Sequence, residues 1–292
     1  MGTSQSSKGP PGNVPMVPPW VPNVPTPSPD MSPPGGPGPG MPNPDGSQNP
    51  PQPGPTTPTA ALPSPIAPNR RFAGARRSLA SFAQTGNAAA MRKGVGHYVR
   101  SGYGGAPTAA RRFGGTANTA SALYSALAPS AAGGAEPTAG ERLDRELLAG
   151  RSAEDIMDSV VEAVRPVDGT QDAEVSRAAI KDSLSELLTK FPDADLLELT
   201  DEERTFAIER FVALDVFRRF AIDLGKTIQD KAPSATLGLA RLKEVKEYVK
   251  ETVSAAFRRL VQSGRSVTSA KISDVVQGAL LDALQVFEHY AQ

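Results

Sequence analysis

A group of basic side chains in the first half of the chain is the feature of the sequence best suited to chemistry. Nine lysine and arginine residues lie between residues 70 and 134, and this stretch contains no aspartate or glutamate. Cations at this density bind phosphate groups, and aromatic residues between them, such as Tyr98 and Tyr103, can stack on bases. One interpretation is nucleic-acid binding, and the other is docking on an acidic protein surface, including the acidic part of this chain. The candidate binding residues are Arg70, Arg71, Arg76, Arg77, Arg92, Lys93, His97, Arg100, Arg111 and Arg112.

The charge of the chain is sorted along the sequence. The formal net charge of all 292 residues is zero, but residues 1–69 carry a net charge of −1, residues 70–134 carry +9 and residues 135–292 carry −8. Separation of charge on this scale indicates either internal docking or binding of separate partners. We therefore expect the basic zone and the acidic zone to have different roles.

Catalytic and metal-binding residue types are scarce. The chain has no cysteine, which excludes a disulfide, a thiolate zinc site and a cysteine nucleophile. Its two histidines, His97 and His289, lie far apart in the sequence, and we build no Ser–His–Asp arrangement from them. The carboxylates after residue 135 follow the spacing of solvated helix faces. We expect no catalytic residue, no metal site and no cofactor, and we expect His289 on the surface.

Two glycine-containing fragments resemble phosphate-binding motifs without completing them. Gly225-Lys-Thr227 matches the end of a P-loop, but Phe220 stands where that motif has its first glycine, and no strand precedes it. Gly94 and Gly96 lack the third glycine of a dinucleotide-binding motif. We interpret the first fragment as helix interior and the second as a place where two backbones approach closely.

Residues 1–69 are predicted to form a disordered tail rich in proline and glycine. Of the 29 prolines in the chain, 23 lie between Pro10 and Pro68, and proline removes the backbone donors that regular structure needs. The only tryptophan, Trp20, is either a chance feature of this tail or an anchor for a groove on a partner. Gly2 is small enough to permit removal of Met1, and the glycine amine then exposed is an unhindered acceptor for modification.

The remainder of the chain is predicted to be all-α. Residues 70–134 read as short helices between glycines, and their many alanines and glycines require close packing or a partner. Residues 135–292 are predicted to form an acidic bundle of six helices. Its helix over about residues 200–232 is apolar nearly all round and is therefore expected at the centre. No apolar run is long enough to cross a membrane and the first residues do not form a signal peptide, so we expect a cytoplasmic protein.

Several blocks of sequence together resemble the QatB family, a component of the bacterial Qat anti-phage defence system. The blocks combine arginine, glycine and aromatic residues in a set that is more specific than any one of them alone. The resemblance spans the whole chain, although the tail contributes only its ends. The blocks are Met1–Ser4, Val17–Trp20, Arg70–Leu79, Gly96–Gly105, Thr108–Gly115 and Asp282–Ala291.

The resemblance implies three partners: an ATPase (QatA), a QueC-like enzyme (QatC) and a TatD-like nuclease (QatD). Relatives of QueC activate a 7-deazaguanine carboxylate with ATP and form a bond to nitrogen. We therefore expect a non-enzymatic scaffold whose Gly2 is modified with a 7-deazaguanine-type base by the QueC-like partner. The alternative is a nucleic-acid-binding adaptor that uses residues 70–112, with the tail as a linker, and a helical enzyme is a third and weaker possibility.

Overall fold

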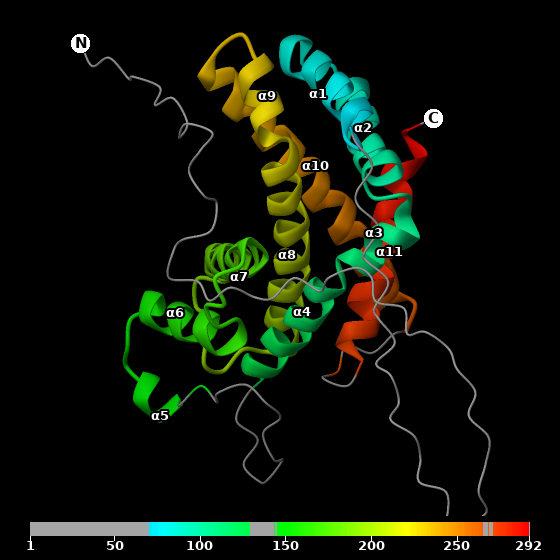
Figure 1. The fold of residues 1–292 in the computed structure, drawn as a ribbon. Helices are drawn as coiled ribbons and strands as arrows, with labels where there is room; N and C mark the ends of the chain where they lie inside the picture. The colour runs from blue at the N-terminus through cyan, green and yellow to red at the C-terminus, as the bar shows by residue number, and fades with distance from the viewer. Residues whose placement is uncertain (1–69, 129–142, 144, 265–267, 269–270, 292) are drawn as a thin grey trace, which may run out of the picture. The chain divides into compact units, whose positions relative to one another are not determined.

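The computed structural model describes residues 70–128, 143, 145–264, 268 and 271–291 (Figure 1). These residues form helices joined by turns, and no strand occurs among them. The all-α fold class predicted from the sequence is confirmed for this part of the chain. The predicted tail over residues 1–69, with Gly2 and Trp20, lies outside the described residues, as does the predicted boundary near residue 134.

Short helices follow one another in the basic zone, as the glycine spacing predicted. Gly86, with φ of 74°, ends the first helix after a bond from its N–H to the carbonyl of Phe82. The Asn87 side chain then caps the second helix by accepting from the N–H groups of Ala89 and Ala90. The helices are α1 (Ala73–Thr85), α2 (Ala88–His97), the π-helical turn η1 (Tyr98–Gly102), α3 (Ala106–Arg112) and α4 (Gly114–Ala126).

Longer helices make up the acidic part, and their starts match the capping residues in the sequence. Ser152 and Thr200 each accept a bond from a backbone N–H in the first helical turn, and Thr200 forms a full capping box with Glu203. The elements are α5 (Arg145–Leu148), α6 (Ala153–Val164), α7 (Gln171–Lys190), α8 (Asp201–Phe220), the π-helical turn η2 (Ala221–Gly225), α9 (Lys226–Lys231), α10 (Ala235–Gln262) and α11 (Ile272–His289).

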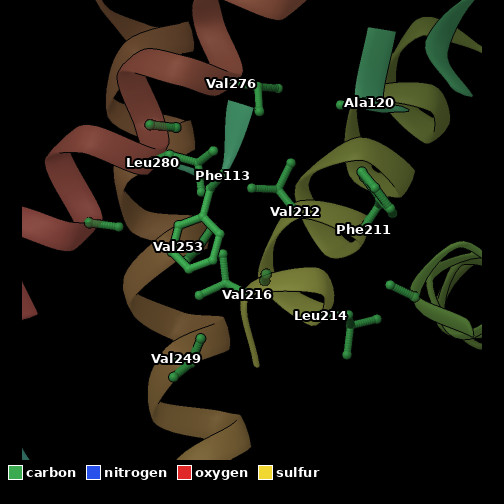
Figure 2. Close-up of a cluster of buried hydrophobic side chains, with 14 of the residues drawn as sticks. Phe113, Ala120, Phe211, Val212, Leu214, Val216, Val249, Val253, Val276 and Leu280 are labelled. Carbon is green, nitrogen blue, oxygen red and sulfur yellow. The ribbon is translucent and has the colours of Figure 1, made fainter. Parts of the chain in front are cut away.

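Helix α8 lies at the centre, as its apolar circumference predicted. It packs on α7, α10 and α4, and Figure 1 shows α7 and α10 on opposite sides of it. One core runs through both charge zones, because Phe113 from the basic zone lies among side chains of α8, α10 and α11 (Figure 2). The same buried cluster contains Val212, Val216, Val253, Val276 and Leu280.

The two glycine-containing fragments, Gly225–Thr227 and Gly94 with Gly96, have the structural roles expected of them. Gly225 closes η2 and Lys226 opens α9, where the Lys226 ammonium lies 3.6 Å from the Asp230 carboxylate on the next turn. A Cβ at Gly94 would lie 2.7 Å from the Leu79 side chain of α1. A Cβ at Gly96 would lie 2.7 Å from the carbonyl oxygen of Phe287 in α11. Helix α2 therefore needs both glycines in order to touch its two neighbours.

We expect Gly96→Ala to lower the free energy of unfolding by about 1–3 kcal/mol, because backbone atoms of α11 cannot move aside as a side chain can. The control is Gly115→Ala in α4, where a Cβ meets no atom within 4 Å. That change should leave stability equal or raise it by up to about 1 kcal/mol through helix propensity. Chemical denaturation of the full chain measures both, and a Gly96→Ala protein as stable as the parent would contradict the close approach.

Candidate anion-binding surface

A buried carboxylate in α8 is bonded to the basic zone through a neutral hydroxyl donor. Asp215 is fully buried and accepts from the Thr116 hydroxyl of α4 at 2.5 Å and from the Ser176 hydroxyl of α7 at 2.8 Å. Its third donor is Nε of Arg219, one turn away on the same helix, at 3.0 Å. Arg219 in turn pairs with Asp172 at 2.9 Å. These bonds satisfy a charge that would otherwise be costly to bury.

A second carboxylate, Asp223, joins the two π-helical turns. The hydroxyls of Tyr98 and Tyr103 lie 3.1 and 3.2 Å from the same carboxylate oxygen of Asp223 in η2. Burial raises the pKa of Tyr98 well above its usual value, and burial also raises the pKa of Tyr103, so both phenols stay protonated. The two tyrosine rings meet edge to face, Phe72 stacks on Tyr98, and Phe113 and Phe220 complete the aromatic group.

A third carboxylate, Glu288 of α11, accepts from the backbone N–H of Ala106 at 2.9 Å and so caps the start of α3. Gly105, with φ of 97°, makes the turn that points this N–H at the glutamate. In all three contacts the donor in the basic zone is a hydroxyl or a backbone amide. None of these three contacts is an ion pair with a cation of the basic zone.

The nine cations of the basic zone consequently have no carboxylate partners among the described residues. All ion pairs that the structure shows join residues between 154 and 258. Arg71 is half-buried over the ring of Phe72, with its guanidinium carbon 4.4 Å from the centroid. The other eight, Arg70, Arg76, Arg77, Arg92, Lys93, Arg100, Arg111 and Arg112, are exposed. We call these nine residues the basic surface.

Three of the predicted cations act electrostatically on the imidazole of His97. His97, at the end of α2, is half-buried, and its Nδ1 atom is buried with no hydrogen-bond partner among the described residues. Burial lowers the pKa of His97, and the charges of Lys93, Arg100 and Arg77 lower it further, in that order. We call Arg77, Lys93, His97 and Arg100 the His97 cluster.

The remaining predicted residues are distributed around this cluster. Arg92 lies over the Tyr290 ring at 5.7 Å and Arg112 over the Tyr103 ring at 5.8 Å. Arg111 reaches the Thr108 hydroxyl at 3.5 Å, and Arg70 and Arg76 are exposed without a described contact to a carboxylate. His289 lines a surface cavity of about 400 Å³, together with Arg259, Asp282, Gln285, Val286 and Tyr290.

Sequence reasoning missed the three carboxylates that hold the basic zone in place. A signal for Asp215 exists, because it is a charged residue on the apolar side of its helix between Phe211 and Val216. No comparable signal marks Asp223 or Glu288, whose partners lie more than a hundred residues away. Among the described residues no group of three His, Asp or Glu side chains could hold a metal ion. No described helix is long and apolar enough to cross a membrane.

Comparison with known proteins gives one match. A family model described as QatB, the Qat anti-phage system associated protein QatB, matches residues 104–287. The matched span includes the helices α3 to α10 and most of α11, and it excludes α1, α2 and η1. Neither the curated proteins nor the solved structures contain a match to this chain.

We expect Thr116→Val to lower the free energy of unfolding by about 1–3 kcal/mol, because the change removes a donor from the buried Asp215 carboxylate. The matched control is Thr236→Val, at an exposed position in α10, which should change stability by no more than about 0.5 kcal/mol. Denaturant unfolding of both proteins measures the difference. Equal effects of the two substitutions would show that the Thr116–Asp215 bond does not stabilise the fold.

Proposed function

From the fact that this chain belongs to the QatB family of the Qat anti-phage system, we propose that it is a non-catalytic adaptor of that system and a substrate for modification. The observation that supports an adaptor is the basic surface, whose nine cations the fold leaves without carboxylate partners among the described residues. Exposed cations without carboxylate partners repel one another and attract anionic partners. The helical body would hold partners while the chain's other parts present groups to them.

Gly2 is the proposed site of modification. The support comes from the sequence: Gly2 follows Met1 directly, and 23 prolines separate it from the first described helix. Proline-rich linkers favour extended conformations, and such a segment would leave the terminal amine accessible to an enzyme's active site. The enzyme implied by the family resemblance is the QueC-like partner (QatC), with the ATPase (QatA) and the TatD-like nuclease (QatD) as further partners in the cytoplasm.

The proposed reaction forms an amide. The QueC-like enzyme would activate the carboxylate of a 7-deazaguanine-type base with ATP. The free amine of Gly2 would attack the activated carbonyl carbon, lose a proton and displace the activating group. Glycine suits this role because its amine is half deprotonated near about pH 7.7–8.0 and no side chain blocks the approach.

Intact-mass measurement of the full chain, co-expressed with and without the QueC-like partner, tests this proposal. We expect loss of Met1 in both samples and an added base-sized mass only with the active partner. Gly2→Gln should retain Met1 and abolish the added mass, because a large second residue blocks methionine removal. Gly9→Gln, which alters the tail but not its terminus, is the matched control and should be modified as the parent is. An unchanged mass with the partner active would overturn the proposal.

Nucleic-acid binding by the basic surface is the second candidate function. The arrangement favours it because eight of the cations are exposed, and aromatic rings lie beside Arg92 and Arg112. Phosphate contacts of this kind release counterions and make the affinity fall steeply with salt. The competing possibility is that an acidic protein surface docks on the same cations. In that case the partner would bind in the absence of any nucleic acid.

We expect the variant with alanine at Arg92, Arg100, Arg111 and Arg112 to lose most of its affinity for single-stranded DNA. The slope of log affinity against log salt should become shallower by about 3, at roughly 0.7 per lost contact to a single strand. The control replaces Arg151, Lys231, Lys243 and Lys271, four exposed cations of the acidic part, by alanine. Fluorescence anisotropy over a salt series measures both, and equal losses in the two variants would argue against a specific surface.

A further inference from the structure

The His97 cluster combines four side chains that donate through nitrogen, and they come from two helices and a π-helical turn. Lys93 precedes His97 by one turn of α2, and Arg100 follows it in η1. Arg77 comes from α1, which passes so close that a Cβ at Gly74 would lie 3.2 Å from Cγ of His97. The absence of a side chain at Gly74 thus allows the imidazole to lie against the α1 backbone. This contact places the ring against α1, the helix that carries Arg77, while Lys93 lies one turn before it in α2.

The two nitrogens of the imidazole differ in their surroundings, and Nε2 is the one that can donate to a ligand. Nδ1 is buried and has no partner among the described residues, whereas the residue as a whole is half-exposed. The neutral ring carries one proton, and placing it on Nε2 keeps an N–H donor on the accessible nitrogen. The charged groups that act on the ring are the cations of α1, α2 and η1, and α11, which packs on α2 at Gly96, adds none.

We propose that a phosphate group binds on the surface beside His97, held by Arg77, Lys93, His97 and Arg100. Two guanidinium groups and an ammonium supply charge-assisted donors, and the imidazole adds a directed donor from Nε2. None of these side chains has a carboxylate partner among the described residues, so a phosphate displaces only water. The phosphate can belong to a nucleic acid or to a small phosphate compound. The inference rests on the basic surface and does not depend on modification of Gly2.

Binding at this site is linked to proton uptake. In the free protein the pKa of His97 is lowered by burial and by three cations, so the ring is neutral at neutral pH. A bound phosphate offsets the repulsion from those cations and raises the pKa of the ring. Between the lowered pKa of the free protein and the higher pKa of the complex, binding takes up a proton. Affinity therefore increases as the pH falls through that window.

The first experiment measures binding of a single-stranded oligothymidylate to the full chain at constant salt. The charge of a phosphodiester is constant in this range, so protonation of the protein sets the pH dependence. We expect affinity to rise about tenfold between about pH 7.5 and about pH 5.5, which corresponds to one unit of pKa shift. His97→Gln should lose this dependence, and His289→Gln, which removes the only other histidine, should retain it.

The second experiment follows the imidazole resonances of the full chain by NMR while inorganic phosphate is added. Because the chain has only two histidines, the His97→Gln protein assigns both signals. We expect phosphate to shift the His97 signal and not that of His289. Arg77→Gln should weaken the phosphate affinity about threefold to tenfold, whereas Arg76→Gln, an exposed neighbour on α1 that does not act on the ring, should not.

The two experiments together separate the sources of the phosphate. A His97-dependent pH effect on the oligothymidylate, with a phosphate-induced shift, supports a nucleic-acid ligand. If phosphate shifts the His97 signal but oligothymidylate affinity does not depend on His97, the result supports a small phosphate compound. If phosphate leaves the His97 signal unchanged and oligothymidylate affinity does not depend on His97, the proposed site is wrong. The mass measurement on Gly2 is unaffected by any of these outcomes, so the two proposals fail separately.

Discussion

The structure depends on carboxylates that receive hydrogen bonds from uncharged donors. Asp215, Asp223 and Glu288 each connect the acidic part to the basic zone, through Thr116, two tyrosine hydroxyls and a backbone N–H. A carboxylate that leaves water must be satisfied, and here the donors that come from the basic zone are all uncharged, while the one cation bound to Asp215 is Arg219 of the acidic part. Because the attachment uses neutral groups, the cations of the basic zone stay outside the core and remain available. The use of neutral donors from the basic zone therefore has two effects. It holds the two zones together, and it leaves the cations of the basic surface free to bind an anion.

The fold was largely accessible from the sequence because its signals are local. Glycines separated the short helices of the basic zone, and the apolar circumference of residues 200–232 placed α8 at the centre. The sequence predicted one continuous helix there, whereas the structure divides it into α8, η2 and α9. A π-helical turn inserts one residue and so shifts the phase of the apolar residues that follow, but a helix that is apolar nearly all round hides this shift.

The candidate site was accessible only in part. Composition identified the basic residues, because nine cations without a carboxylate are visible in any reading of residues 70–134. Which of them meet depends on how α1 crosses α2, and that crossing is set by Gly74, Gly94 and Leu79. Sequence spacing places Lys93 and His97 on one helix face but carries no information about Arg77, which arrives from a different helix. The sequence identified each residue of the His97 cluster as a candidate, but only the tertiary structure shows which of them belong together.

The unpartnered cations also affect the protein when nothing is bound. Like charges that share a surface repel each other, and this repulsion favours looser states of the helices that carry them. Added salt screens the repulsion over a distance of about 8–10 Å at ordinary ionic strength, so it relieves the same strain that a bound polyanion relieves. A ligand thus gains affinity from repulsion stored in the empty protein. The repulsion among these cations therefore sets both the affinity for an anionic ligand and the rigidity of α1 to α3. A partner that occupies the basic surface also stabilises the folded state of these helices.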